Sequence, residues 1–298
     1  MDNKRILSIQ SHVVSGYVGN KSSVFPLQLL GFEVDNINSV QLSNHTGYPN
    51  GIKGQTLDST QLWELIQGLD DNNLLSSYGT IITGYVRDKS FLEKIVEVVK
   101  LLRKKCPNIE FVCDPVMGDI ETGFYVPEEL LDVYKSSVLP LADICLPNQF
   151  ELQLITGITI QTEEDVVKAL QMVHDIGVKT VILSSLEFKG TKSLTVYASS
   201  YKENRIFKVT TPMIPTTFVG SGDLFTALCT AWLKTEDLGK SLKKAIATMQ
   251  SILQKTFLEA GPDNLSNPRK KELKLIQSKK VIENPDTSGI ELTYLSKK

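Results

Sequence analysis

The segment from Pro215 to Phe225 contains the pattern Gly-x-Gly-Asp, and an apolar run at helical spacing follows it. Glycines let the backbone approach a ligand closely, and the unpaired N–H groups at the start of a helix attract an anion such as a phosphate. Gly220, Ser221 and Gly222 supply such groups. Asp223 lies at the edge of this predicted anion site, where a carboxylate can accept the proton of a hydroxyl that attacks phosphorus. A turn with Asp223 as an ordinary helix N-cap is the simpler interpretation of the pattern alone.

Composition narrows the class of protein that carries this pattern. The chain has 298 residues, of which 41% are hydrophobic, so it can bury a sizeable core. A net charge of −2 gives no reason to expect a nucleic-acid partner. We find no secretory signal and no apolar run of membrane-spanning length, and the four cysteines are scattered, as is typical of reduced, buried thiols. These features predict a cytoplasmic protein that does not bind membranes.

Strand-like and helix-like patterns alternate along most of the chain, which predicts an α/β fold with a mainly parallel central sheet and helices on both faces. We see no linker or repeat and therefore expect one domain over residues 1–298. A polar tail after Ile282 is expected to run over the surface. Expected strands are 5–10, 32–40, 80–85, 111–115, 144–146 and 180–183, with an antiparallel pair at 194–198 and 205–209. Expected helices are 24–30, 59–69 (capped by Ser59 or Thr60), 91–102, 128–134, 148–155, 166–176, 224–233, 241–258 and 269–278.

Polar side chains follow most of these strands, and ligands of such sheets bind outside the carboxyl ends of the strands. Asp114, Asp119 and Glu151 are acids that can hold Mg²⁺ against a nucleoside triphosphate. The alternative is that Asp114 forms a turn before a proline and that Glu151 caps a helix. Glycines on both sides of Asp119 are typical either of a mobile lid or of an ordinary surface turn.

Aromatic and hydroxyl groups at other strand ends suit a flat, polar ring. Tyr85 follows a glycine at a strand end and can stack on such a ring. His12 and His45 each lie beside a hydroxyl, from Ser11 and Thr46 respectively, so each can serve the ring or the fold. His174 lies among charged residues of an expected helix and is interpreted as structural.

Several of these segments together resemble the pyridoxal kinases, the vitamin B6 branch of the ribokinase-like superfamily. The resemblance runs in order from Ile9 to about Ala231 and extends toward Gln277-Ser278. The segments that carry it are Gln10-Ser-His-Val-Val, Gly16-Tyr-Val-Gly-Asn-Lys21, Ser43-Asn-His-Thr-Gly-Tyr48, Thr83-Gly-Tyr85, Val112-Cys-Asp-Pro-Val-Met-Gly-Asp119, Pro147-Asn-Gln-Phe-Glu151 and Phe218-Val-Gly-Ser-Gly-Asp-Leu-Phe225.

The resemblance implies an ATP-dependent kinase that phosphorylates the 5′-hydroxymethyl group of pyridoxal, and usually of pyridoxine and pyridoxamine. It implies Mg²⁺, with Zn²⁺ as the alternative metal, K⁺ as an activator, and a homodimer. Asp223 matches the family's base and Gly220, Ser221 and Gly222 its anion hole. The remaining correspondences are Ser11, Val18, His45, Thr46 and Tyr85 around the ring; Asp114, Asn148, Glu151, Ser184 and Ser185 on the nucleotide side; Ile214, Pro215 and Thr216 at the adenine pocket; and Asp119, Glu151 and Asp114 around the metal.

The chain also departs from the family pattern. Leu146 stands where many relatives carry Thr, which removes a hydroxyl that can contact a monovalent cation, and Ser221 replaces the more usual Thr. The lid from Asp119 to Tyr125 is short beside some eukaryotic relatives. Two alternatives remain open at this point: a hydroxymethylpyrimidine-type kinase of the same superfamily, and a protein that binds vitamin B6 without catalysis.

Overall fold

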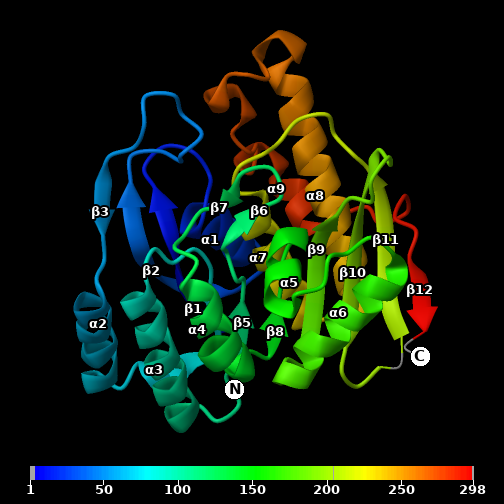
Figure 1. Ribbon diagram of the computed structural model, residues 1–298. Coiled ribbons are helices and arrows are strands. Elements are labelled where there is room, and N and C mark those ends of the chain that lie inside the picture. The colour runs from blue at the N-terminus through cyan, green and yellow to red at the C-terminus, as the bar shows by residue number, and fades with distance from the viewer. Residues whose placement is uncertain (1–3, 204, 297–298) are drawn as a thin grey trace.

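The computed structural model describes residues 4–203 and 205–296, which are organised around one ten-stranded sheet (Figure 1). A separate two-stranded hairpin is formed by β6 and β7. The strands are β1 Arg5–Val13, β2 Glu33–Leu42, β3 Gly54–Thr56, β4 Tyr78–Thr83, β5 Glu110–Cys113, β6 Gly118–Asp119, β7 Gly123–Phe124, β8 Ile144–Cys145, β9 Thr180–Leu186, β10 Ser193–Ser200, β11 Arg205–Pro212 and β12 Thr293–Ser296. The helices are α1 Asn20–Leu29, α2 Ser59–Asp71, α3 Lys89–Lys105, α4 Leu130–Val133, α5 Gln149–Thr156, α6 Glu163–Ile176, α7 Ser221–Leu233, α8 Leu238–Ala260 and α9 Lys279–Glu283.

The strand order across the large sheet is β12-β11-β10-β9-β8-β5-β4-β1-β2-β3. Every neighbouring pair from β2 through β9 is parallel, whereas β3 at one edge and β10 to β12 at the other pair antiparallel. The predicted mainly parallel sheet is therefore confirmed. Since parallel strands end at the same edge, the segments that follow β1, β4, β5, β8 and β9 meet there.

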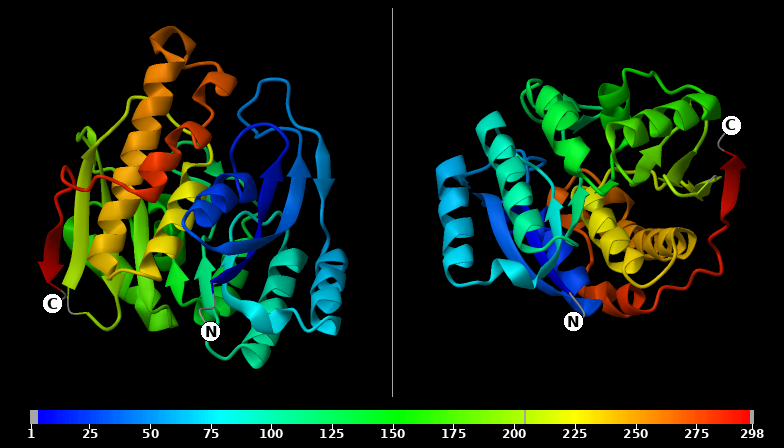
Figure 2. Two further views of the ribbon diagram at one scale, coloured as in Figure 1. Left: turned by 180° about the vertical axis from the view of Figure 1, so that it is seen from behind. Right: turned by 90° about the horizontal axis from the view of Figure 1, so that it is seen from below.

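Two layers of helices cover the two faces of the sheet (Figure 2). Side chains alternate along each strand, so that on β4 Ile81 packs into the core under α2, α3 and α6, while Ile82 packs into the core under α1, α7 and α8. The central strands are apolar on both faces for this reason. The fully buried run of β4 is an example, because no residue of that strand faces solvent.

The C-terminal region differs from the sequence-based expectation. The expected helix over 269–278 is wrong: short 3₁₀ turns at Pro268–Lys271 and Ile276–Ser278 flank a short irregular stretch there. Within it Leu273 and Leu275 are both fully buried, and the Leu275 amide bonds to the Leu273 carbonyl at 2.9 Å across a tight turn that a continuous helix does not contain. The described tail after Ile282 runs over the surface, as expected, and it also adds β12 to the sheet edge by pairing with β11.

Capping residues explain where α2 begins and where α6 ends. Asp58, and not Ser59 or Thr60, caps α2: its side chain accepts a hydrogen bond from the Gln61 amide, and the Gln61 side chain bonds back to Asp58. Gly177 ends α6 with a positive φ of 127°, as a C-terminal glycine is expected to do.

Within residues 4–203 and 205–296, no helix is both long and apolar enough to cross a membrane. The four cysteines are buried and free. His174 is buried as well, and its ring bonds to the Val178 carbonyl and the Ser199 hydroxyl, which supports its structural interpretation.

Asp143, directly before β8, connects three elements at the amino end of the sheet. Its Oδ2 accepts hydrogen bonds from the Phe111 amide at 2.8 Å and from Arg103 at 3.1 Å, and its Oδ1 lies 2.7 Å from Lys179 Nζ. The residue is buried. Removal of this carboxylate leaves the buried Phe111 amide without its acceptor, whereas Arg103 keeps its hydrogen bond to the Leu141 carbonyl.

We expect Asp143→Ala to lower the free energy of unfolding by about 2 kcal/mol, because it leaves the buried Phe111 amide without a hydrogen-bond acceptor. Urea unfolding followed by circular dichroism measures the change. The exposed Asp132 provides the control Asp132→Ala. A loss no larger than that of the control would contradict the structural role of Asp143.

Candidate active site

The Gly-x-Gly-Asp segment forms the N-terminus of α7, as predicted. Gly220 is the N-cap, with φ 81°, and a Cβ on this residue would lie 1.9 Å from the Tyr17 carbonyl oxygen. Only glycine fits this position. A Cβ on Gly222 would meet nothing within 4 Å, and Gly222 is exposed. The first turn of α7 is therefore accessible at Gly222, as an anion site requires.

Asp223 does not cap its own helix, since α7 has no side-chain cap and Gly220 holds the cap position. The simpler interpretation of the pattern is therefore wrong. Asp223 Oδ2 instead accepts a hydrogen bond of 2.8 Å from the amide of Gly19, the N-cap of α1. A Cβ on Gly19 would lie 2.0 Å from the Ser11 carbonyl oxygen, so Ser11, Gly19 and Asp223 are direct neighbours.

Two serines of α1 fix this helix against α7. Ser22 Oγ donates to the Gly220 carbonyl at 3.0 Å, and Ser23 Oγ donates to the Asp223 carbonyl at 3.1 Å. Both serines are fully buried. The N-termini of the two helices consequently meet at Asp223, where their dipoles favour the ionised carboxylate.

Asp114 follows β5 and lies buried under the start of α7. Its Oδ2 accepts a hydrogen bond of 2.8 Å from Thr226 Oγ1. Burial and repulsion by the Asp223 carboxylate raise the pKa of Asp114 to about 7. Burial likewise raises the pKa of Asp223 to about 6, and the Gly19 amide opposes that rise. The two acids thus form an electrostatically coupled pair.

Asn148 and Glu151 form a capping box at the start of α5. The Asn148 side chain accepts from the Glu151 amide at 3.0 Å, and Glu151 Oε2 accepts from the Asn148 amide at 2.8 Å. Glu151 Oε1 accepts from the Met117 amide at 3.0 Å. Burial and the nearby Asp114 charge raise the pKa of Glu151 well above its ordinary value. The capping interpretation of Glu151 is confirmed.

Asp119 stabilises the turn of the β6–β7 hairpin. Its carboxylate accepts from the Glu121 amide at 2.9 Å, from the Thr122 amide at 2.7 Å and from the hydroxyl of Tyr125. Among the described residues, no group of three or more His, Cys, Asp or Glu side chains is arranged to hold a metal ion. Asp114, Asp119 and Glu151 therefore make no metal site by themselves, and a cation here would need phosphate oxygens as additional ligands.

Of the residues predicted to hold the ring, Ser11 lies near the end of β1, and the others lie on the segments that follow β1, β2 and β4. His45 is buried, whereas Thr46 is exposed. A Cβ on Gly47 would lie 3.8 Å from a methyl group of Val219, directly before the anion loop. Tyr85 is half-buried, which raises the pKa of its phenol, and its carbonyl accepts from Ser39 Oγ at 2.9 Å.

The remaining residues expected on the nucleotide side lie on β9 and on the loop before α7. Ser184 lies beside Asn148, because its amide donates to the Pro147 carbonyl at 2.9 Å. Ser185 lies on β9, and the segment 214–216 lies on the loop between β11 and α7. Among the described residues, no side-chain hydrogen bond joins Thr46, Ser185 or the 214–216 segment to Asp223.

Sequence reasoning missed three groups of this site: the Gly19 amide, Thr226 and Glu272. The glycine pair Gly16 and Gly19 was a signal of close backbone approach, although it does not form a P-loop. Thr226 lies one helical turn after the Gly-x-Gly-Asp pattern and points toward Asp114. Glu272 offered no local signal, since its partner His45 comes from the opposite end of the chain, with Nε2 3.2 Å from Glu272 Oε1.

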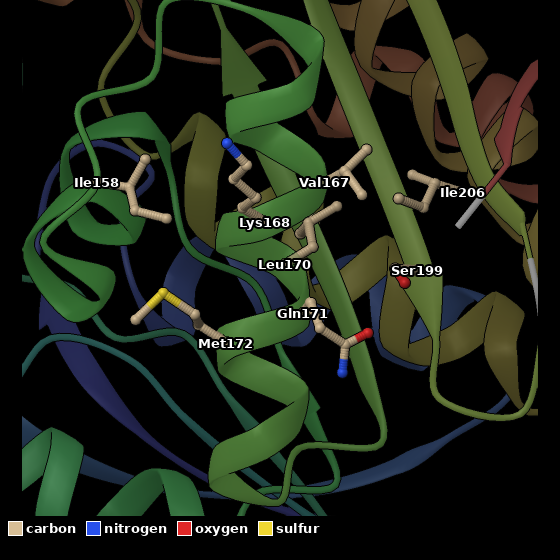
Figure 3. A pocket seen from close by; sticks show the side chains of 8 residues that line it. All are labelled: Ile158, Val167, Lys168, Leu170, Gln171, Met172, Ser199 and Ile206. Carbon is tan, nitrogen blue, oxygen red and sulfur yellow. The ribbon is translucent and has the colours of Figure 1, made fainter. Parts of the chain in front are cut away.

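A hollow of about 390 Å³ lies elsewhere, between α6 and the strands β10 and β11 (Figure 3). Ser199, which lines it, pairs with Val181 near the start of β9. The hollow is therefore at the amino end of the parallel strands, away from Asp114 and Asp223. Its other lining side chains are mostly apolar and include Ile158, Val167 and Ile206.

Comparison with known proteins places this geometry in a family. A family model described as phosphomethylpyrimidine kinase matches residues 80–264. A pyridoxal kinase of Arabidopsis thaliana is 47% identical over 95% of this chain and 93% of its own, and one of Homo sapiens is 43% identical over 95% and 96%. A solved pyridoxal kinase of Leishmania donovani in complex with ADP and pyridoxamine superposes with a TM-score of 0.91 at 31% identity, over 98% of this chain and 99% of that one. With a coupled pair of acids at a helix N-terminus and near-complete coverage by these relatives, the chain belongs to the pyridoxal kinase family.

Proposed function

We propose that this chain transfers the terminal phosphoryl group of ATP to the 5′-hydroxymethyl group of pyridoxal, pyridoxine and pyridoxamine, with Asp223 as the general base. The observation that carries the proposal is the place of Asp223 between two helix N-termini, bonded to Gly19 and adjoining Ser11. A primary alcohol is a weak nucleophile while it keeps its proton. A carboxylate with a pKa of about 6 is ionised at neutral pH and basic enough to accept that proton.

The amides of Gly220, Ser221 and Gly222 are proposed to bind the phosphoryl group during transfer. They belong to the first turn of α7, and the space beside Gly222 is open. Amides fixed in this way stabilise charge that develops on the phosphoryl oxygens, and they need no rearrangement during the reaction. Phosphoryl transfer depends mainly on such positioning and charge stabilisation.

The ring of the vitamin is proposed to lie between the loops that carry Ser11, Val18, His45, Thr46 and Tyr85. Tyr85 offers a half-buried aromatic face at the end of β4. Ser11 adjoins Gly19 and thereby Asp223, so a hydroxymethyl group between them would be within reach of the base. The hydroxyl groups of Ser11 and Thr46 suit the ring nitrogen and the phenolic oxygen of the vitamin.

ATP is proposed to extend from the anion loop past Asp114, Asn148, Glu151, Ser184 and Ser185, with its adenine near Ile214, Pro215 and Thr216. A divalent cation fits this donor set, because Asp114 and Glu151 are both buried and lie close together, and the Asp223 carboxylate repels Asp114. Asp114, Asp119 and Glu151 would hold Mg²⁺ or Zn²⁺, directly or through water. When bound, the ion neutralises charge on the phosphates.

Further properties follow from the family and belong to the same proposal. The Leu146 side chain is buried in the core, so K⁺ would have to be held by backbone carbonyls in that region. Homodimer formation is proposed on the resemblance. A cytoplasmic location is supported by the four free, buried cysteines.

We expect Asp223→Asn to lower kcat by a factor of about 10² to 10⁴, the usual contribution of a general base. Asparagine can still accept the hydrogen bond from Gly19, so pyridoxal binding should persist. Steady-state kinetics and equilibrium binding of pyridoxal measure the two effects, and Asp263→Ala at an exposed position is the control. Near wild-type turnover of Asp223→Asn would exclude this residue as the base.

The rate should fall as the pH drops through about 6. Asp223 acts only when ionised, and its raised pKa of about 6 places the loss just below neutral pH. Asp114, with a pKa of about 7, is mostly protonated before Asp223, with a pKa of about 6, takes up its proton. Asp114→Asn carries no charge there either and should therefore leave the acidic limb of the kcat/KM profile near pH 6. ATP titrates identically with both proteins, so any difference between their profiles comes from the protein. An acidic limb that moves well below pH 6 in Asp114→Asn would contradict this order of titration.

The acceptor preference separates the proposed function from that of a pyrimidine kinase, which the matching family model makes the second candidate. We expect phosphorylation of pyridoxal, pyridoxine and pyridoxamine and little or no phosphorylation of hydroxymethylpyrimidine, because Ser11, His45 and Thr46 belong to the vitamin B6 pattern. An ATP-consumption assay over these four alcohols, with and without K⁺, measures the preference. Preferential use of the pyrimidine would overturn the proposed substrate, and binding of pyridoxal without turnover would favour a non-catalytic protein.

A further inference from the structure

Glu272 receives hydrogen bonds from two loops that are far from it in the sequence. The first loop, residues 14–19, connects β1 to α1, and the second loop, residues 43–53, connects β2 to β3. Its Oε1 accepts from the Tyr48 hydroxyl at 3.0 Å and from His45 Nε2 at 3.2 Å. Its Oε2 accepts from the Tyr17 amide at 3.0 Å. Burial alone would raise the pKa of Glu272, but these hydrogen bonds outweigh it and lower the pKa, so the carboxylate is ionised at neutral pH.

The backbone of the first loop is shaped to accept this carboxylate. Gly16 has a φ of 101°, and a Cβ on it would lie 2.4 Å from Glu272 Oε1. Both its conformation and its surroundings therefore require glycine. The close approach brings the Tyr17 amide onto the carboxylate and leaves no room for another group between them.

The second loop is oriented through the imidazole of His45. Nδ1 of this ring accepts a hydrogen bond of 3.1 Å from the Gly47 amide, so the ring proton lies on Nε2 and faces Glu272. The ring also packs on Tyr48, with centroids 4.9 Å apart. Glu272 thus fixes the tautomer and the orientation of His45, directly before Thr46.

Glu272 itself has a firm attachment to the rest of the protein. The next residue, Leu273, is fully buried in the core beneath α7 and α8, as is Leu275. The Lys274 amide donates to Thr256 Oγ1 of α8 at 3.2 Å. The carboxylate is therefore carried by a segment that α8 holds in place.

Two different carboxylates hold the last residues of the first loop. Glu272 holds the Tyr17 amide and Asp223 holds the Gly19 amide, so that only Val18 lies between the two attachment points. We propose that Glu272 is a positioning residue for the acceptor alcohol: by holding Tyr17 and His45 it places Val18 and Thr46 around the vitamin ring. The inference rests on the proposed ring site and adds a residue that does not itself touch the substrate.

The test is Glu272→Gln. The amide has the size of the carboxylate, but its NH₂ group must face either the Tyr17 amide or the His45 and Tyr48 donors, and so it breaks one side of the network. We expect KM for pyridoxal to rise about tenfold, the effect of losing one charge-assisted hydrogen bond. KM for ATP should stay unchanged, and kcat should fall less than KM rises, because Asp223 and the anion loop remain.

Two further variants complete the experiment. Glu259→Gln is the matched control, since Glu259 is exposed on α8 and makes one surface ion pair with Lys255 at 3.1 Å. Tyr48→Phe removes a single donor from Glu272 and should raise KM for pyridoxal by less than Glu272→Gln does. In a protein that already carries Glu272→Gln, the rise in KM for pyridoxal caused by Tyr48→Phe should be smaller, as expected for groups in one hydrogen-bond network.

An unchanged KM for pyridoxal in a folded Glu272→Gln protein would overturn the inference, and so would an equal rise in KM for ATP. If Glu272→Gln fails to fold, Tyr48→Phe decides, and an unchanged KM for pyridoxal in that variant rejects the role. Failure of the proposed function would look different, because the unmodified protein would then not phosphorylate pyridoxal.

Discussion

The repulsion between the buried Asp114 and the partly buried Asp223 beside it is the constraint on which the architecture of the site depends. A carboxylate is costly to bury, and a second one beside it raises the cost further. The protein offsets this cost with directed donors: the Gly19 amide to Asp223 and the Thr226 hydroxyl to Asp114. The convergence of α1 and α7, fixed by two buried serines, supplies the favourable ends of two helix dipoles. In return, the acid beside the anion loop has a proton affinity suited to catalysis near neutral pH.

The same convergence of α1 and α7 explains why glycine is required at positions 19 and 220. Gly19 adjoins the Ser11 backbone, and Gly220 adjoins the Tyr17 backbone, so three chain segments meet with no side chain between them. At both positions φ is positive, which removes most other residues from consideration. The short distances between backbone segments let amides, rather than flexible side chains, contact the carboxylate of Asp223.

The sequence was sufficient to predict the central strands of the sheet and the acids that follow them, because these depend on local patterns. Apolar runs indicated those strands, and the Gly-x-Gly-Asp pattern indicated the start of α7. The short edge strands β3 and β12 were missed, and the prediction also failed where a residue's environment is set by distant parts of the chain. A helix is predicted over residues 269–278, but Leu273 and Leu275 are both buried in the core beneath α7 and α8. Glu272 appeared as one more charge in a basic stretch, and only the folded chain brings His45 to it.

The distance along the chain between Tyr17 and Glu272, 255 positions, has a consequence for synthesis. The first loop of the protein leaves the ribosome early, whereas the carboxylate that holds it is made near the end of translation. Until then Gly16 and Tyr17 have no anchor on that side, and the pocket for the acceptor alcohol stays incomplete in the nascent chain. Completion of the C-terminal segment therefore finishes the site, and a chain that stops before residue 272 lacks this anchor for the loop.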